Sequence, residues 1–592
     1  MADTPVEIKK TKVNIDGQDV EVEAGSVIIQ AAKKAGVYVP HFCYHEGLSI
    51  VGQCRMCFVE VEGQRKLATA CSTPVAEGMK IKTNSEAVKA GQNGTLEFIL
   101  LNHPLDCPIC DRGGECKLQD YTLEYGPPRS RMVDDKVLRD KHRHISDQIV
   151  LDQERCILCT RCTRFSSEVD GRAELVVNER GNASHIDVFE GHPLKSPYSG
   201  NVVDLCPVGA LTAQDFRFEA RPWELKKHEA ICTNCSGGCN IEIHTKHRHP
   251  GIVRPDKQSP RPEIKRLMPR ENLEVNEWWM CDKGRWGYHY HNEDENRIQQ
   301  PMIRKSTGLT AVSLKEWTLE LENAGDWEFW IDGNFPHEGI AWVKELAKSW
   351  KERNRKVEIN PSTHGEKFLK VWSKFIAESP WGAGPAKWHG IQEVVCSKSY
   401  RELEGIAPIL SLRLGQRVRK GQLKWTVVAD PLSVPASPEK AFLIDVPRSK
   451  EALEQLEKFS TKSNLLILWR QANSRGLVNE GIAPTELLGD GGTSTKNVFL
   501  FAQKTKNDIS QGLNAKINLA KKLFVANSFF DKAWKEKVHG VLPLTPLYET
   551  RATLTNVEGH RQLSQGIHLY HPNTPAINRG TEEMINPSLR LI

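Results

Sequence analysis

The residues best suited to chemistry in this 592-residue chain are its sixteen cysteines. All but one lie between Cys43 and Cys281, and only Cys396 follows them. A small exported protein rich in cysteine would indicate a disulfide scaffold, but this chain is long and opens without the apolar stretch of a signal peptide. The cysteine-rich part therefore predicts metal or redox chemistry, and spacing divides it into four groups.

The first group has the spacing Cys-x10-Cys-x2-Cys-x13-Cys and consists of Cys43, Cys54, Cys57 and Cys71. Plant-type ferredoxins bind a binuclear iron–sulfur cluster with a related layout and a shorter first gap. A zinc ribbon is the alternative interpretation. The segment 6–36 has the pattern of a hairpin followed by a helix, which favours a β-grasp ferredoxin.

The second group has three close cysteines, Cys107, Cys110 and Cys116, and needs a fourth ligand. His103 lies four residues before Cys107, where the predicted helix 86–101 ends. Imidazole is an established iron–sulfur ligand, as Rieske centres show. We therefore expect His103 to complete a tetranuclear site.

The third group follows the bacterial-ferredoxin pattern, with Cys156, Cys159 and Cys162 on one turn and Cys206 followed by a proline. This pattern predicts one tetranuclear cluster, because a two-cluster ferredoxin would carry two such runs. Zinc rarely uses three cysteines at this interval.

The fourth group consists of Cys232, Cys235, Cys239 and Cys281. Its spacing suits a tetranuclear cluster, and zinc remains an alternative. The four groups use every cysteine except Cys396, which we expect to be a small buried apolar residue. Several clusters in one chain indicate electron relay.

Basic residues flank the cysteines and could offset the negative charge of thiolates and clusters. The alternative is that these side chains are simply solvated. They are Arg55, Arg112, Lys117, Arg161 and Arg164.

The elements that position these groups differ between the two halves of the chain. The stretch 247–269 is rich in proline and charge and predicts a loop. After residue 300, β-like runs such as 327–331 and 465–469 alternate with helical runs such as 339–352, which predicts α/β layers.

Composition sets further limits. The chain has 80 basic and 75 acidic residues, so its net charge of +5 indicates neither a nucleic-acid nor a membrane-surface partner. No apolar run approaches the roughly 18 residues that cross a bilayer. We expect a soluble, unexported protein with no nucleotide-binding glycine loop and no catalytic residue of its own.

The ordered series of cysteine groups, with His103 before Cys107, resembles the large iron–sulfur subunit (the G subunit) of the proton-pumping NADH–quinone oxidoreductase, respiratory complex I. The resemblance covers the N-terminal half, residues 1–300. It implies a 2Fe-2S cluster on the first group and 4Fe-4S clusters on the second and third. The fourth group resembles an additional 4Fe-4S cluster, off the main electron path, that marks some bacterial members.

The family implies partners and a location. Electrons would come from a flavin-binding, NADH-oxidising subunit, pass the binuclear, the all-cysteine and then the histidine-ligated cluster, and leave to a two-cluster ferredoxin-like subunit and the quinone-site subunits. The chain would lie in the peripheral arm at the cytoplasmic face of a bacterial inner membrane. It would bind no FMN and would meet the membrane only through the complex.

The C-terminal half resembles a shortened molybdopterin oxidoreductase that binds no molybdopterin. The segments 469–476 and 553–562 look like remnants of that fold. Within the second segment we interpret Asn556, Glu558 and Gly559 as a structural turn and not as a site.

The predicted protein is thus a multidomain α+β and α/β chain. Its expected domains are a β-grasp 2Fe-2S ferredoxin domain (1–85), a 4Fe-4S domain with one histidine and three cysteine ligands (86–126), a 4Fe-4S ferredoxin-like domain (127–225), an additional 4Fe-4S domain (226–300) and the degenerate molybdopterin-oxidoreductase-like region (301–592).

Two alternative functions remain open. One is the iron–sulfur relay subunit of a soluble NAD-linked hydrogenase or formate dehydrogenase. The other is a zinc-bearing scaffold, which would explain cysteine pairs but not the ferredoxin run. A catalytic hydrogenase or molybdenum dehydrogenase would need ligands in the C-terminal half, where only Cys396 is available.

Overall fold

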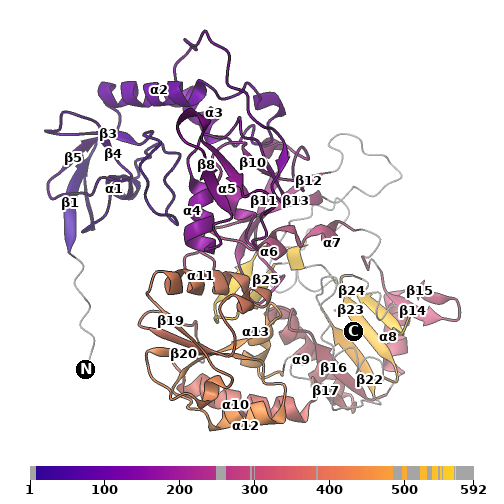
Figure 1. Cartoon of the computed structure of the whole chain (residues 1–592). Coiled ribbons are helices and arrows are strands. Elements are labelled where there is room, and N and C mark those ends of the chain that lie inside the picture. Colours follow the sequence, from indigo (N-terminus) through magenta and orange to yellow (C-terminus); the bar gives the residue numbers. More distant parts are fainter. Residues whose placement is uncertain are drawn as a thin grey trace. The chain divides into compact units, whose positions relative to one another are not determined.

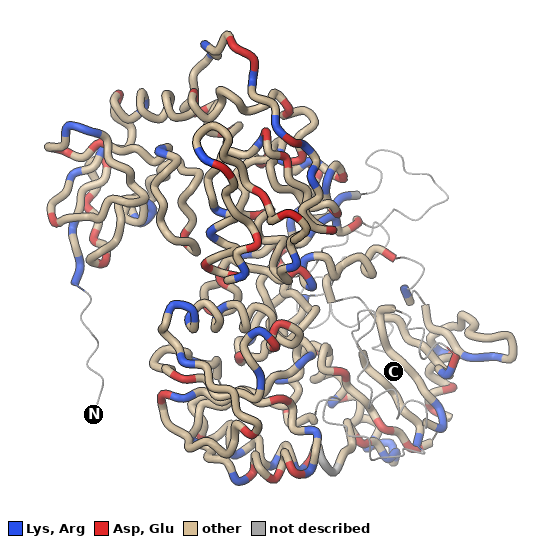
Figure 2. The backbone as a smooth tube through the Cα atoms, in the orientation of Figure 1, with Lys and Arg blue, Asp and Glu red and all other residues tan. Residues whose placement is uncertain are grey.

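The computed structural model describes residues 9–247, 262–293, 297–298, 300–323, 325–381, 384–483, 496–502, 520–529, 536–544, 547–549, 551–565 and 567. It divides into two compact units, Met1–Leu225 and Lys226–Ile592 (Figure 1). Figure 2 shows basic and acidic residues interspersed along both units. Within the described ranges, no helix has the length and apolar character needed to cross a membrane.

The first unit begins with a mixed five-stranded sheet in the order β2-β1-β5-β3-β4. Strands β1 (Lys10–Ile15) and β2 (Gln18–Glu23) form the expected hairpin, and α1 (Ile28–Lys34) follows. The turn between the strands needs positive φ at Asp16 (46°) and Gly17 (91°). The other strands are β3 (Phe58–Val61), β4 (Ala68–Thr69) and β5 (Lys80–Lys82).

The remainder of the first unit combines short helices with small sheets. The predicted helix 86–101 is α2 (Glu86–Leu100), whose first turn is capped by the Ser85 hydroxyl, which accepts a hydrogen bond from Val88 N at 3.4 Å. Further elements are α3 (Lys117–Tyr125), β6 (Arg143–His144), β7 (Ile149–Leu151), α4 (Arg161–Arg164), β8 (Leu175–Asn178), β9 (His185–Val188), α5 (Asn201–Leu205) and β10 (Leu211–Ala213).

The second unit opens with an antiparallel sheet of β11 (Lys226–Ile231), β12 (Asn240–His247) and β13 (Pro262–Pro269). The predicted loop over 247–269 is therefore wrong for 262–269, where Ile264 and Leu267 are buried. The register shifts opposite His244/Thr245, where Lys265 of β13 is skipped, and this extra residue interrupts the usual alternation of a strand. Residues 248–261 lie outside the described part.

Two further sheets provide the expected α/β layers. The larger has seven strands in the order β15-β14-β24-β23-β22-β16-β17, and the smaller has four in the order β19-β18-β20-β21. Strands β14 and β15 join antiparallel, while the pairs from β24 to β17 and all pairs of the smaller sheet are parallel. The buried strands are nearly all apolar, as parallel sheets covered on both faces require.

The strands of the larger sheet are β14 (Met302–Lys305), β15 (Gly308–Ala311), β16 (Trp327–Ile331), β17 (Val357–Ile359), β22 (Asn497–Phe501), β23 (Leu523–Asn527) and β24 (Gly540–Pro543). Those of the smaller sheet are β18 (Glu393–Cys396), β19 (Lys424–Val427), β20 (Lys440–Asp445) and β21 (Asn464–Leu468). The helices of this unit are α6 (Asp282–Trp286), α7 (His289–Asn292), α8 (Leu314–Glu322), α9 (His337–Glu352), α10 (Thr363–Glu378), α11 (Pro408–Arg419), α12 (Lys450–Lys458) and α13 (Ser474–Asn479).

Two details of the second unit bear on the sites. Cys396 is 1% exposed within the core of the smaller sheet, which confirms the prediction of a buried apolar role. Strands β25 (Ala552–Thr555) and β26 (Arg561–Ser564) form an antiparallel hairpin, and Asn556, Glu558 and Gly559 lie in its turn, as predicted.

Candidate metal centres

The first cysteine group comes together in the loops beside the five-stranded sheet. The Cys43 thiol contacts those of Cys54 and Cys71, and the Cys57 thiol also contacts that of Cys71. Cys43 N donates to Cys54 Sγ at 3.4 Å. Cys43, Cys57 and Cys71 are buried and Cys54 is partly exposed, so this site is almost closed to solvent.

The second group lines one cavity of about 250 Å³, with His103, Cys107, Cys110 and Cys116 all in its wall. His103 Nδ1 is buried and has no hydrogen-bond partner among the described residues. Burial, assisted by the positive charges of Lys136 and Arg155, lowers the pKa of His103 to about 4. The imidazole is therefore neutral at pH 7, which is the form that binds metal.

The third group occupies a tight turn that enters α4. Leu158 and Thr160 adopt left-handed φ values of 52° and 57°, which non-glycine residues rarely do, and these bends turn the chain between successive cysteines. Cys156, Cys159, Cys162 and Cys206 line a small cavity of about 20 Å³. Burial raises the pKa of Cys156 to about 12 and that of Cys159 to about 11, and the neighbouring thiolates add to both shifts.

The fourth group lies in the second unit, and its four cysteines are all buried. Cys232 follows β11, Cys239 precedes β12 and Cys281 caps α6, where its Sγ accepts from Gly284 N at 3.4 Å. A Cβ on Gly284 would lie 3.2 Å from Cys232 Sγ and 3.5 Å from Cys281 Sγ. Burial raises the pKa of Cys239 and Cys281, and repulsion from the other thiolates of the group raises it further.

These surroundings suit a cation or a metal cluster. Crowded thiolates in a buried site repel one another, and a bound cation removes that cost. Sulfur with one imidazole is a donor set for iron–sulfur clusters and for zinc. Within the described residues, no three His, Cys, Asp or Glu side chains have the geometry of a single-ion site.

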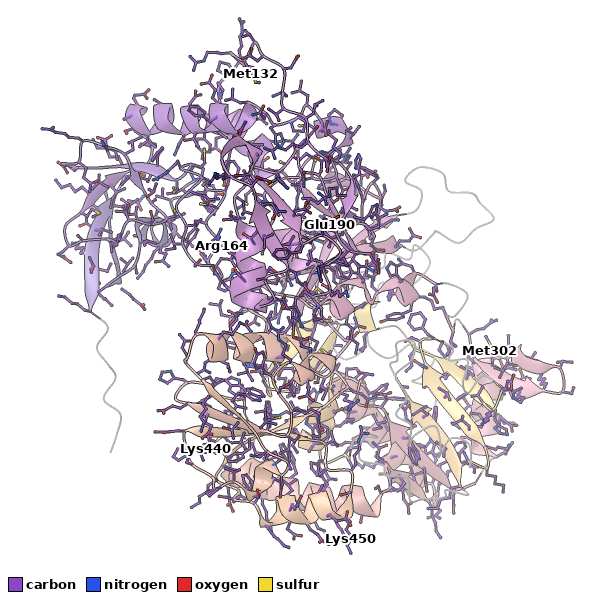
Figure 3. All side chains as sticks on the ribbon, viewed as in Figure 1. Met132, Arg164, Glu190, Met302, Lys440 and Lys450 are labelled. Carbon is purple, nitrogen blue, oxygen red and sulfur yellow. The ribbon has the colours of Figure 1, made fainter. Side chains whose placement is uncertain are left out.

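The third group is linked to each of the other two groups of the first unit through an arginine side chain. Arg164 on α4 (Figure 3) donates to the Cys43 carbonyl at 2.5 Å and to the Cys159 carbonyl at 3.3 Å. Arg112, which follows Cys110, donates to the Cys206 carbonyl at 2.9 Å. One groove of about 600 Å³ also borders Cys54, His103 and Cys156, one candidate residue from each of the first three groups.

The burial of the basic neighbours bears on the two interpretations that the sequence left open for them. Arg161 and Arg164 are 4% and 8% exposed, so they are not simply solvated. Their positive charges lower the pKa of Cys159, which opposes the larger effect of burial. Burial lowers the pKa of Lys117 to about 8. Arg55 is exposed and is better described as a solvated side chain.

Two structural features around the sites were not predicted from the sequence. A Cβ on Gly209 would lie 2.1 Å from Cys110 Sγ, so only glycine fits there. The β25–β26 hairpin contacts the loop of the fourth group, although the sequence suggested only a structural turn. The pattern Cys-Pro-x-Gly at 206–209 is the one signal that could have drawn attention to Gly209.

Four family models match consecutive parts of the chain. They describe a 2Fe-2S iron–sulfur cluster binding domain (residues 9–86), an NADH-ubiquinone oxidoreductase-G iron–sulfur binding region (92–131), an NADH-quinone oxidoreductase subunit 3 ferredoxin-like domain (146–212) and a molybdopterin oxidoreductase Fe4S4 domain (225–293). Each match contains one complete cysteine group. These matches support a multidomain chain with 2Fe-2S and 4Fe-4S binding domains.

Curated relatives carry consistent names. The G subunit of the NADH-quinone oxidoreductase of Streptomyces coelicolor is 41% identical over 298 residues, 50% of this chain and 34% of that protein. The G subunit of the Rickettsia felis enzyme is 37% identical over 426 residues, 70% of this chain and 59% of that protein. The mitochondrial NADH-ubiquinone oxidoreductase 78 kDa subunit of Neurospora crassa is 43% identical over 393 residues, 64% of this chain and 50% of that protein.

The chain thus spans between about a third and three fifths of the length of these relatives. Among solved structures, an NAD+-reducing [NiFe]-hydrogenase chain is 28% identical and covers 36% of this chain and 90% of that one, with a TM-score of 0.33. A TM-score this low assigns neither fold nor function.

Proposed function

Since the chain is homologous to the G subunits of NADH-quinone oxidoreductases, we propose that it is the electron-relay subunit of such a complex. The single observation that carries this proposal is that the members of each cysteine group come together at a site of their own, so that the chain has four such sites. Iron–sulfur clusters, when bound, take up and release single electrons.

The ligand assignments follow the four groups. A 2Fe-2S cluster would be held by Cys43, Cys54, Cys57 and Cys71. Three 4Fe-4S clusters would be held by His103, Cys107, Cys110 and Cys116, by Cys156, Cys159, Cys162 and Cys206, and by Cys232, Cys235, Cys239 and Cys281. The unpartnered His103 Nδ1 in the wall of a 250 Å³ cavity supports the histidine ligand. Zinc stays an alternative for the fourth group.

The role of this chain's own residues is to hold the clusters, shield them and tune them. Main-chain N–H groups donate to ligand sulfurs at Cys54, Cys156, Cys235 and Cys281, each at 3.4 Å. Such hydrogen bonds raise the reduction potential of a cluster. The arginine links place the third group next to both the first and the second, which suits a relay in which it is the middle carrier.

The remaining features of the complex are part of the same proposal. The partners would be a flavin-binding NADH-oxidising subunit, a two-cluster ferredoxin-like subunit and quinone-site subunits. The chain would lie in the peripheral arm at the cytoplasmic face of a bacterial inner membrane. The expected domains end at residues 85, 126, 225 and 300, and the region 301–592 would bind no molybdopterin.

Deletion of the gene, with membranes assayed for NADH-dependent quinone reduction, tests the function. We expect the activity to be lost and to return when the wild-type gene is restored. Unchanged NADH–quinone activity, with loss of hydrogen- or formate-dependent NAD reduction, would support the soluble relay subunit instead. Full activity in every assay would point to the zinc-bearing scaffold.

A further inference from the structure

The hairpin of β25 and β26 is bound directly to the loop that carries the fourth cysteine group. Three consecutive main-chain carbonyls of this loop each accept one hydrogen bond from the hairpin: Ser236 from Val557 N at 2.7 Å, Gly237 from Asn556 Nδ2 at 3.1 Å, and Gly238 from Gln562 Nε2 at 2.8 Å. The whole loop between Cys235 and Cys239 is thereby anchored by residues more than 300 positions away in sequence.

The donors of the hairpin are themselves held in place. Asn556 is 1% exposed, and its Oδ1 accepts from His560 N at 2.8 Å. Gln562 Oε1 accepts from Asn240 Nδ2, so one amide group connects both sides of Cys239. Gly238 has φ of 62°, and a Cβ there would lie 2.7 Å from Asn556 Cβ. The two segments therefore fit only with glycine at this position.

Hydrogen bonds to Glu558 and Val557, most of them from charged side chains, hold the turn between β25 and β26 in place. The Glu558 carboxylate, 2% exposed, accepts from Arg413 Nη1 at 2.9 Å and from Trp388 Nε1 at 2.6 Å. Arg475 donates to the Val557 carbonyl at 3.0 Å. The turn thus belongs to the rigid core of the second unit.

The anchoring has a direct consequence for one ligand. The C=O and N–H of a planar trans peptide point in opposite directions. Val557 N fixes the carbonyl of the Ser236–Gly237 peptide, and Gly237 N of the same peptide donates to Cys235 Sγ at 3.4 Å. The hairpin therefore aims an N–H group at a ligand sulfur.

We infer that the β25–β26 hairpin is a positioning element for the fourth site, which fixes the Cys235–Cys239 loop and raises the reduction potential of the cluster held there. This inference rests on the proposed 4Fe-4S cluster of that group. It assigns the C-terminal region a role in tuning a cluster whose ligands all lie outside that region.

The experiment compares Gln562→Met and Asn556→Ala with the wild-type chain carrying its clusters. The matched control is Gln455→Met, the same change at an exposed position of α12. EPR-monitored redox titration follows each cluster, and iron release in air is timed. We expect a more negative midpoint potential and several-fold faster iron loss for the fourth cluster only, with the other three clusters and the control unchanged.

The outcomes separate the inference from the function on which it rests. An intact fourth cluster with unchanged potential and iron loss in Gln562→Met, a partly exposed position, would overturn the role of the hairpin alone. Zinc in the fourth site of the wild-type chain would overturn the cluster assignment and the tuning role together. If circular dichroism shows that Asn556→Ala does not fold, the result for Gln562→Met alone tests the role of the hairpin.

Discussion

Gly209 lies so close to Cys110 that a Cβ added to the glycine would be 2.1 Å from the cysteine sulfur. Gly209 follows Cys206 of the third group, while Cys110 belongs to the second. The same added atom would lie 3.3 Å from Arg112 Cβ, so it has little room to move aside. The close approach of these two loops thus depends on a missing side chain.

Gly209→Ala should therefore displace Cys110 and disturb the histidine-ligated cluster. We expect the EPR signal of that cluster to be lost or altered, with the 2Fe-2S signal retained. Gly94→Ala is the matched control, because a Cβ on Gly94 meets nothing within 4 Å. An unaltered spectrum in Gly209→Ala would mean that the loops of Gly209 and Cys110 can move apart without disturbing the histidine-ligated cluster.

His103→Ala should alter one tetranuclear EPR signal and spare the other clusters. The physical reason is that His103 has a buried nitrogen without a partner in the cavity that Cys107, Cys110 and Cys116 also line. His192→Ala, at an exposed position, serves as control. Identical spectra for the two variants would remove His103 from the ligands.

Metal analysis of the anaerobically purified chain should find about 14 iron atoms, from one binuclear and three tetranuclear clusters. About 10 iron atoms with one zinc would reassign the fourth group to zinc. Because ligands assemble around metal, chelation should unfold the loops of the first unit, which circular dichroism would register. Near-zero iron with stoichiometric zinc would contradict the relay function.

Leu321→Ala should destabilise the second unit by about 2–5 kcal/mol, since it leaves a cavity at a fully buried position of α8. Leu319→Ala, two residues earlier on the same helix, should change stability by less than about 0.5 kcal/mol because Leu319 is 55% exposed. Urea unfolding followed by tryptophan fluorescence measures both. Equal effects would show that Leu321 does not contribute to the core of the second unit.

The Glu393 carboxylate should make a pH-dependent contribution to stability. Hydrogen bonds from Thr426 and from Lys424, whose Nζ lies 3.0 Å away, and then the charge of Lys424 lower the pKa of Glu393 below its usual value of 4.5. A lowered pKa in the folded state means stabilisation that is present above pH 4.5 and lost as pH falls through the folded value.

Glu393→Gln should therefore lower the free energy of unfolding at pH 7 by less than about 1 kcal/mol, since Lys424 is largely exposed. The difference from wild type should shrink as the pH falls below 4.5 and the carboxylate takes up its proton. Urea titrations at neutral and acidic pH test this, and a difference that is independent of pH would refute the electrostatic explanation.

The local parts of the fold and of the sites were predictable from the sequence. Three cysteines within a few residues must share one loop, so the spacing of Cys156, Cys159 and Cys162 already predicts a common site. Apolar periodicity predicted α2, and the Asp16-Gly17 turn predicted the first hairpin, because both signals lie within one continuous segment of the chain.

Tertiary structure decided what depends on segments far apart in the chain. Strand β13 was missed because an extra residue, Lys265, breaks the alternation of its buried residues, and only pairing with β12 makes the segment a strand. The sheet orders and the contact of Asn556 and Gln562 with the fourth cysteine loop have no local pattern. The physical reason is that the hydrogen bond between residues 238 and 562 forms only when the intervening chain has folded. The local sequence of either segment therefore cannot predict this bond.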